Sequence, residues 1–296
     1  MRLGFDLGGT NLAYGIVDSN GALLVQDGIP LVEKNPEAVV ELMVTIYKKM
    51  AEQFEIEKVG IGVPGIVSQR EGVVVILVNL HWRMVPLEAM LKAHIHVPIQ
   101  VGNDANAACI AEVLFGGMAG YQDAMLLTLG TGLGGGVISG GKLLLGSHGA
   151  GGELGHMVIA ENEYACNCGR NGCLETFASA TALIKKYNML NPEVPVTDAK
   201  SVFDRMQNGD TMADETVDWF CEHFASGIVN FYNLFAPEVI AIGGGVAKAF
   251  PIFESRLKHK VQSRLFSKDI HYGNIVAAKL GNDAGIIGAA YLDAFL

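Results

Sequence analysis

The chain of 296 residues carries one short pattern twice, and this repeat limits its fold more than any other feature. In each copy an apolar strand pattern leads into a glycine-rich turn and then into a second strand pattern, at residues 3–17 and 125–138. An internal repeat indicates a duplicated supersecondary unit. We therefore expect two α/β domains, each with one such hairpin near its start.

The two turns are suited to binding an anion. A glycine-rich turn presents backbone N–H groups with no side chain in the way, and a preceding carboxylate can hold a phosphate-bound Mg²⁺ ion. Each turn alone can also be an ordinary hairpin, but two together can hold the phosphates of one nucleotide. The predicted nucleotide-binding residues are Asp6, Gly8, Gly9, Thr10, Asn11, Gly130, Thr131 and Gly132.

Three cysteines and one histidine lie close together in residues 151–175. Three thiolates and an imidazole form a closed tetrahedral ligand set for a structural Zn²⁺ ion. A disulfide is the alternative, but bridging Cys166 to Cys168 would be strained and would leave one cysteine over. The spacing therefore predicts a zinc site made by His156, Cys166, Cys168 and Cys173.

Asp104 lies where a predicted strand, residues 99–101, ends and a helix of small residues begins. An aspartate at such a place is often the helix N-cap. Ligands of α/β sheets, however, bind outside the carboxyl ends of strands, and phosphoryl transfer to a hydroxyl needs a carboxylate that accepts the proton. Both roles are open for Asp104 from the sequence.

Several motifs resemble the ROK family (repressor, open reading frame, kinase), which contains bacterial sugar kinases and sugar-responsive repressors. They are Gly-Glu-Leu-Gly-His ending at His156, Cys-x-Cys-Gly-x-x-Gly-Cys-x-Glu ending at Glu175, and the Asp-x-Gly-Gly-Thr turn at Asp6. Residues 175–183 and 280–290 look like those of the family's glucokinases. The resemblance extends over nearly the whole chain.

The resemblance implies an actin-like ATPase (ribonuclease H-like) α/β fold with an interdomain cleft. Residues 1–117 with 283–296 are expected to form the N-terminal domain, and residues 118–282 the C-terminal domain with the zinc motif. It further implies ATP-dependent phosphorylation of a hexose, most similar to the conversion of D-glucose to glucose 6-phosphate. The implied cofactors are ATP, Mg²⁺ and structural Zn²⁺.

Site residues are carried over from the family position by position. Asp104 corresponds to the general base, and Gly243, Gly244 and Gly245 to the adenosine-side loop. The implied substrate-binding residues are Gly65, Asn79, Asn103, Asp104, Glu153, His156 and Glu175. His156 has two implied roles, because an imidazole can bind zinc through one nitrogen and donate a hydrogen bond from the other.

One segment departs from the family pattern. Asn79-Leu80-His81-Trp82 has histidine where many relatives carry glycine before the tryptophan. We predict that Trp82 packs in the interior and that His81 faces solvent. Because this segment borders the implied sugar site, the hexose stays open among glucose, N-acetylmannosamine, N-acetylglucosamine, fructose, mannose and allose.

Composition narrows the function further. A formal net charge of −10 disfavours nucleic acid and anionic membranes as partners. No signal-peptide pattern or membrane-length apolar run is visible, and five cysteines, three of them in the zinc motif, suit a reducing compartment. We expect a cytoplasmic protein with Cys109 and Cys221 as inert core residues, and the resemblance suggests a homodimer.

Two other functions are alternatives to a kinase. The resemblance implies that a ROK repressor carries a helix-turn-helix before the first hairpin; because this hairpin begins at Asp6 and the chain is acidic, we do not expect a DNA-reading element. An actin-like structural ATPase would share the hairpins but gives no reason for Glu153, His156 and the cysteines together.

Overall fold

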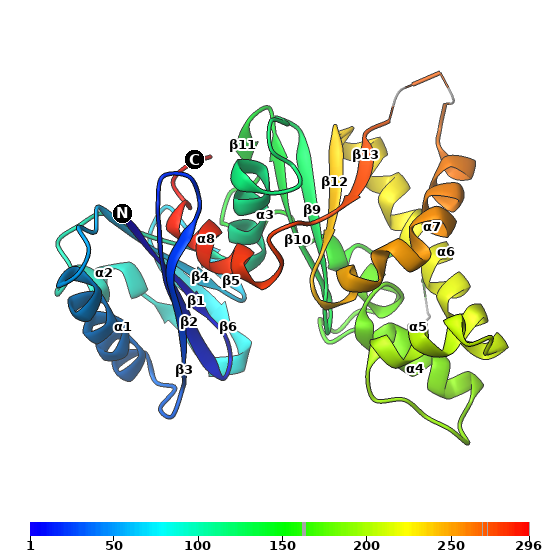
Figure 1. Cartoon of the computed structure of the whole chain (residues 1–296), viewed down its shortest axis with the longest axis horizontal. Coiled ribbons are helices and arrows are strands. Elements are labelled where there is room, and N and C mark those ends of the chain that lie inside the picture. The colour runs from blue at the N-terminus through cyan, green and yellow to red at the C-terminus, as the bar shows by residue number, and fades with distance from the viewer. Residues whose placement is uncertain (162–163, 268, 271, 296) are drawn as a thin grey trace. The chain divides into compact units, whose positions relative to one another are not determined.

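The computed structural model describes residues 1–161, 164–267, 269–270 and 272–295 (Figure 1). The chain divides into two compact units. The first unit comprises Met1–Gln122, Gly136–Gly152 and Lys279–Leu296, and the second unit comprises Asp123–Gly135 and Glu153–Ala278. The sequence-based domain bounds, which assign all of 118–282 to one domain, stay a prediction.

The first sheet has five strands in the order β3-β2-β1-β4-β8. Strands β1, β2 and β3 are antiparallel neighbours, whereas β4 and β8 run parallel to β1. Strands β1, β2, β4 and β8 are mostly buried, whereas the edge strand β3 is half-buried or exposed along its whole length. The bounds are Arg2–Leu7 (β1), Asn11–Val17 (β2), Leu23–Pro30 (β3), Lys58–Val63 (β4) and Ile99–Asn103 (β8).

The second sheet repeats this arrangement in the order β11-β10-β9-β12-β13. Strand β9 corresponds to β1, and β12 and β13 run parallel to it. The duplicated strand–turn–strand pattern of the sequence is therefore confirmed as a duplicated sheet topology. The bounds are Ala124–Leu129 (β9), Leu133–Ser139 (β10), Lys142–Leu143 (β11), Val239–Gly243 (β12) and Asn274–Ala277 (β13).

A small three-stranded sheet in the first unit carries the segment that departs from the family pattern. It consists of β5 (Ile66–Ser68), β6 (Val73–Leu77) and β7 (Trp82–Val85). Trp82 is buried as predicted, and its indole N–H donates to the carbonyl of Lys34 at 2.7 Å. His81 is exposed as predicted, and its φ of 57° lies in the left-handed region.

The helices follow the apolar periodicity of the sequence, with two corrections. The sequence favours one helix over residues 175–190, but residues 174–176 form only a 3₁₀ turn. The α-helix begins at Ala180, because Ser179 caps it by accepting from the N–H of Ala182. The apolar residues over 283–295 favour one long final helix, whereas the observed helix ends at Ala290. The bounds are Pro36–Ala51 (α1), Leu87–Lys92 (α2), Asp104–Phe115 (α3), Ala180–Leu190 (α4), Ala199–Gln207 (α5), Thr211–Phe235 (α6), Phe250–Arg264 (α7) and Ala284–Ala290 (α8).

Helices α3 and α8 pack on one another and on the first sheet. Within this packing the carboxylate of Glu112 is completely buried. It accepts backbone N–H groups from Gly117 at 2.6 Å, Lys279 at 2.8 Å and Leu280 at 2.7 Å. Glu112 thereby ties the chain leaving α3 and the chain entering α8 to the same helix.

The predicted core cysteines are buried, Cys109 in α3 and Cys221 in α6. Over the described residues, no helix has both the length and the apolar character needed to cross a bilayer.

Candidate functional site

The first glycine turn joins β1 to β2 in the first unit. It is closed by the N–H of Gly8, which donates to the carbonyl of Asn11 at 2.9 Å. A Cβ at position 9 would come within 2.9 Å of Asn79 Cβ, so only glycine leaves room for this side chain. The structure thus brings a predicted sugar-side residue, Asn79, against the predicted phosphate turn, a contact that the sequence does not reveal.

Two carboxylates, Asp6 and Asp104, are neighbours in the first unit. Burial, followed by the negative charge of Asp104, raises the pKa of Asp6 from 3.8 to about 6. Burial also raises the pKa of Asp104, and the N–H of Ala105, which donates to its Oδ1 at 2.9 Å, partly offsets this. A pair of carboxylates beside a turn that is predicted to bind an anion is typical of a functional site that recruits a cation or a proton.

Asn103, and not Asp104, caps α3. Its Oδ1 accepts from the N–H of Asn106 at 3.0 Å, and its amide group donates to the carbonyl of Gly65 at 3.1 Å. The N-cap interpretation of Asp104 is therefore wrong, since Asp104 is the first helical residue. Its carboxylate is left available for another role.

Gly65 has a φ of 132°, and a Cβ there would collide with the carbonyl of Ile76. Its contact with Asn103 therefore depends on a conformation that glycine readily adopts. The structure brings together Gly65, Asn103 and Asp104 among the predicted substrate-binding residues of the first unit.

The second glycine turn joins β9 to β10. The N–H of Gly130 donates to the carbonyl of Gly132 at 3.0 Å, and the carbonyl of Gly130 accepts from the N–H of Ala180 at 2.8 Å. A Cβ at Gly132 would come within 2.5 Å of Glu175 Oε2. The turn therefore lies between the start of α4 and a predicted sugar ligand.

The predicted adenosine-side loop is a neighbour of this second turn. Gly243 ends β12, and Gly244 has a φ of 79°. A Cβ at Gly244 would lie 2.5 Å from the carbonyl oxygen of Leu129, the residue before Gly130. Gly245 begins a 3₁₀ segment that ends at Ala249. The strand ends of β9 and β12 thus place two predicted parts of the nucleotide site side by side.

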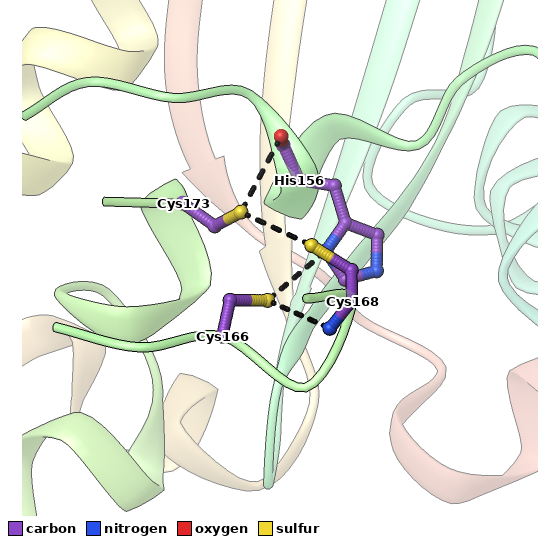
Figure 2. A group of neighbouring side chains, drawn as sticks. All are labelled: His156, Cys166, Cys168 and Cys173. Atoms are coloured by element: carbon purple, nitrogen blue, oxygen red, sulfur yellow. Dashed lines mark hydrogen bonds between the residues drawn. The ribbon is translucent and has the colours of Figure 1, made fainter. Parts of the chain in front are cut away.

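The four predicted zinc ligands converge in the second unit (Figure 2). Their ligand atoms all lie within 4.8 Å of one another. Cys168 Sγ is 3.6 Å from Cys173 Sγ, and Cys166 Sγ is 3.5 Å from His156 Nδ1. Two thiolates on one tetrahedral Zn²⁺ lie about 3.8 Å apart, given a Zn–S bond of about 2.3 Å. The donor set and its spacing therefore fit a zinc ion.

Glu175 joins this cluster to the second glycine turn. Its Oε1 lies 3.0 Å from Cys166 Sγ and 3.7 Å from His156 Nδ1. Its other oxygen is directed at Gly132. Glu153 is exposed and precedes the 3₁₀ turn Leu154–His156, where its carbonyl accepts from the N–H of His156 at 3.1 Å. The link from the cysteines to the glycine turn was not predicted from the sequence.

The duplicated sheets and the glycine turns define an α/β protein of the actin-like ATPase fold. A model of the ROK family matches residues 2–294, and the chain belongs to this family. A glucokinase of Thermotoga maritima is 36% identical, with 97% of this chain and 95% of the relative covered.

Two solved structures are similar over nearly their whole length. A ROK hexokinase from Thermus thermophilus has a TM-score of 0.87 and 32% identity, covering 99% of this chain and 98% of that chain. A ROK family glucokinase from Streptomyces griseus, in complex with glucose and AMPPNP, has a TM-score of 0.82 and 30% identity, covering 98% of each chain.

Proposed function

We propose that this chain, an ATP-dependent sugar kinase of the ROK family, phosphorylates D-glucose to glucose 6-phosphate. The observation that carries the proposal is the carboxylate pair Asp6 and Asp104 in the unit that also holds the first glycine turn. The full-length similarity to glucokinases supports glucose as the acceptor.

Asp104 is proposed as the general base. A sugar hydroxyl is a poor nucleophile, and its proton must leave as the new bond to phosphorus forms. A carboxylate within hydrogen-bond reach accepts this proton and orients the oxygen. Its place as the first residue of α3, with Asn103 acting as the cap, leaves Asp104 free to do so.

The nucleotide is proposed to bind through the glycine turns. Backbone N–H groups of Gly8–Asn11 and Gly130–Gly132 would contact the phosphates, and the loop Gly243–Gly245 would contact the adenosine. Asp6 would hold the Mg²⁺ ion, which when bound neutralises charge on the phosphates. The raised pKa of Asp6, caused first by burial and then by the charge of Asp104, supports this role, because a divalent cation would stabilise the ionised form against both.

The sugar is proposed to bind through planar amide and carboxylate groups, which can each bridge two vicinal hydroxyls. The proposed ligands with such groups are Asn79, Asn103, Asp104, Glu153 and Glu175, and the backbone of Gly65 and the imidazole of His156 are proposed as further ligands. We also propose that His156, Cys166, Cys168 and Cys173 hold a structural Zn²⁺ ion, which keeps Glu175 and His156 in position. The family resemblance further suggests a homodimer, which light scattering of the purified chain would test.

A coupled assay with Mg-ATP and a panel of hexoses tests the function. Glucose is expected to give the highest kcat/KM, and the panel includes N-acetylmannosamine, N-acetylglucosamine, fructose, mannose and allose. The Asp104→Asn variant gives the background. A better acceptor than glucose would correct the substrate, and turnover of every sugar at the background rate would overturn the assigned chemistry.

A further inference from the structure

The buried carboxylate of Glu112 is a charged group that the proposed function does not use. It lies at the start of the last turn of α3, near the negative end of the helix dipole, where a carboxylate is disfavoured. The side chain is completely buried, so the carboxylate has also lost its hydration. A carboxylate that is present despite both effects points to a role beyond filling the core.

The two oxygens of Glu112 hold two different segments of the first unit. Oε2 accepts from the N–H of Gly117 at 2.6 Å, where the chain leaves α3. Oε1 accepts from the N–H groups of Lys279 at 2.8 Å and Leu280 at 2.7 Å, directly before the 3₁₀ turn that leads into α8. A side-chain amide has only one acceptor oxygen, so a carboxylate is needed to accept from both segments.

Helix α8 fits closely against both α3 and Asp6. The two helices lie side by side within the first unit (Figure 1). A Cβ at Gly288 would come within 1.7 Å of the carbonyl oxygen of Ala107 in α3, so the two backbones are in direct contact. In the first turn of α8, a Cβ at Gly285 would come within 2.5 Å of Asp6 Oδ2. A small shift of this turn would therefore change the surroundings of Asp6.

One helix, α3, joins Glu112 to the carboxylate pair. Asp104 is the first residue of α3, and Glu112 follows about 12 Å further along the helix axis. We propose that Glu112 is a positioning residue for phosphoryl transfer. By fixing the segment that enters α8, it holds Gly285 against Asp6 and thereby keeps Asp6 beside Asp104.

The inference rests on the proposed role of Asp6 as the Mg²⁺ ligand. Mg²⁺ requires a nearly ideal octahedral arrangement of oxygens, so its affinity depends on how precisely Asp6 is held. Loss of Glu112 should therefore raise the Mg²⁺ concentration that gives half-maximal velocity by roughly tenfold, as is usual when a group that orients a metal ligand is removed. The KM for glucose should stay unchanged.

Hydrogen exchange of the full chain, measured by mass spectrometry on peptides covering residues 279–290, tests the first step without an enzyme assay. Glu112→Ala should speed exchange in these peptides more than in the rest of the first unit, because the N–H groups of Lys279 and Leu280 lose their acceptor. The matched control is Met43→Ala, which removes a completely buried side chain from α1 and also lowers the stability of the unit. The control should show no such excess.

Steady-state kinetics with varied Mg²⁺ test the second step. Asp6→Asn should raise the Mg²⁺ requirement most, Glu112→Ala should raise it by roughly tenfold, and Met43→Ala should leave it unchanged. Glu112→Gln can still accept from Lys279 and Leu280 and should stay near the wild type. If Glu112→Ala does not fold, Glu112→Asp replaces it, since its carboxylate is one methylene short of its partners and should shift both measurements in the same direction.

The positioning role is overturned if the Glu112 variant shows no excess exchange over residues 279–290. It is also overturned if that variant has the same Mg²⁺ requirement as Met43→Ala while Asp6→Asn has a raised one, and this outcome leaves the proposed function intact. An unchanged Mg²⁺ requirement in Asp6→Asn would instead refute the proposed role of Asp6, and the positioning role with it.

Discussion

The two sheets share one strand order, yet the residues at the ends of equivalent strands differ in type. Strand β1 leads into Asp6-Leu7-Gly8, whereas β9 leads into Thr128-Leu129-Gly130, so a threonine stands where the first copy has a carboxylate. The same contrast recurs at the outer parallel strand. Strand β8 is followed by Asp104, and β13 by Ala278. Both copies of the strand–turn–strand unit have a glycine turn. Only the first copy has aspartates at the two strand ends, so the acidic pair Asp6 and Asp104 lies in the first unit.

The two units also stabilise their irregular segments differently. In the first unit the buried carboxylate of Glu112 holds three backbone N–H groups. In the second unit the described residues between Glu153 and Ser179 form only two short 3₁₀ turns and isolated bridges, and four metal-type donors converge among them. A buried carboxylate can accept hydrogen bonds from only a few backbone N–H groups, whereas a bound metal ion can hold a whole loop in one conformation.

The largest expected effect concerns the acidic pair. Asp104→Asn keeps the shape and most hydrogen bonds of the side chain but removes the base, so kcat should fall by roughly 10²–10⁴-fold. Binding of glucose and ATP should persist. Steady-state kinetics measure the change, with Glu153→Gln as a comparison that should mainly raise KM for the sugar. A near-normal kcat in Asp104→Asn would show that the base is misassigned.

The next effect concerns the stability of the first unit. Glu112→Ala leaves three buried N–H groups without an acceptor and should lower the free energy of unfolding by about 2–4 kcal/mol. Glu112→Gln should cost less, because its amide oxygen can still accept from Lys279 and Leu280. Denaturant titration compares the two variants. Equal stability of wild type and Glu112→Ala would mean that these segments are held by other contacts.

The corresponding test in the second unit removes a thiol from the metal-type cluster. Cys168→Ser should lose bound zinc and lower activity by roughly tenfold, because Glu175 and His156 are no longer held in place. Metal analysis and kinetics check this, with Cys221→Ala as a cysteine control that should retain the metal. If the metal-free variant kept full activity and thermal stability, the organising role of the cluster would be refuted.

The smallest expected effect is a pH dependence of stability, which we expect for a substitution at Asp6 in the first unit and not at the equivalent residue of the second unit. The pKa of Asp6 is about 6 in the folded chain and 3.8 as its ordinary value, so the folded state binds more protons between these values. Stability contributed by this group is therefore present below pH 4 and lost as pH rises through 6. Asp6→Asn should be more stable than wild type by up to about 2 kcal/mol at pH 7.

Thermal unfolding without Mg²⁺ and nucleotide, recorded at pH 4 and pH 7, measures this difference. The gain at pH 7 should disappear at pH 4, while kinase activity of Asp6→Asn should be low at both. Thr128→Ala, at the equivalent position of the second copy, is the matched variant and should show no such pH-dependent gain. If the stability of Asp6→Asn and of the wild type changed equally between pH 4 and pH 7, burial would not raise the pKa of Asp6.

Local patterns in the sequence determined the duplicated strand–turn–strand frame, the four converging zinc-type ligands and the burial of Trp82. These features are readable because apolar alternation, glycine turns and metal-ligand spacing act over a few residues. The sequence does not reveal the edge strand β3, because its residues are mostly exposed and do not alternate clearly between apolar and polar. The apolar residues after Ala290 would favour a longer helix, but α8 ends at Ala290.

Only the tertiary structure decided that Asn103 caps α3 and that Asp104 does not, although either residue type is a good cap. It also decided that Asp6 and Asp104 are neighbours, that Asn79 lies against Gly9, and that Glu175 links the cysteines to the second turn. Each of these contacts depends on strand pairing or loop closure between distant residues. The free energy of each contact depends on the burial and the charge that the two residues share once they meet. A short stretch of sequence contains only one of the two residues.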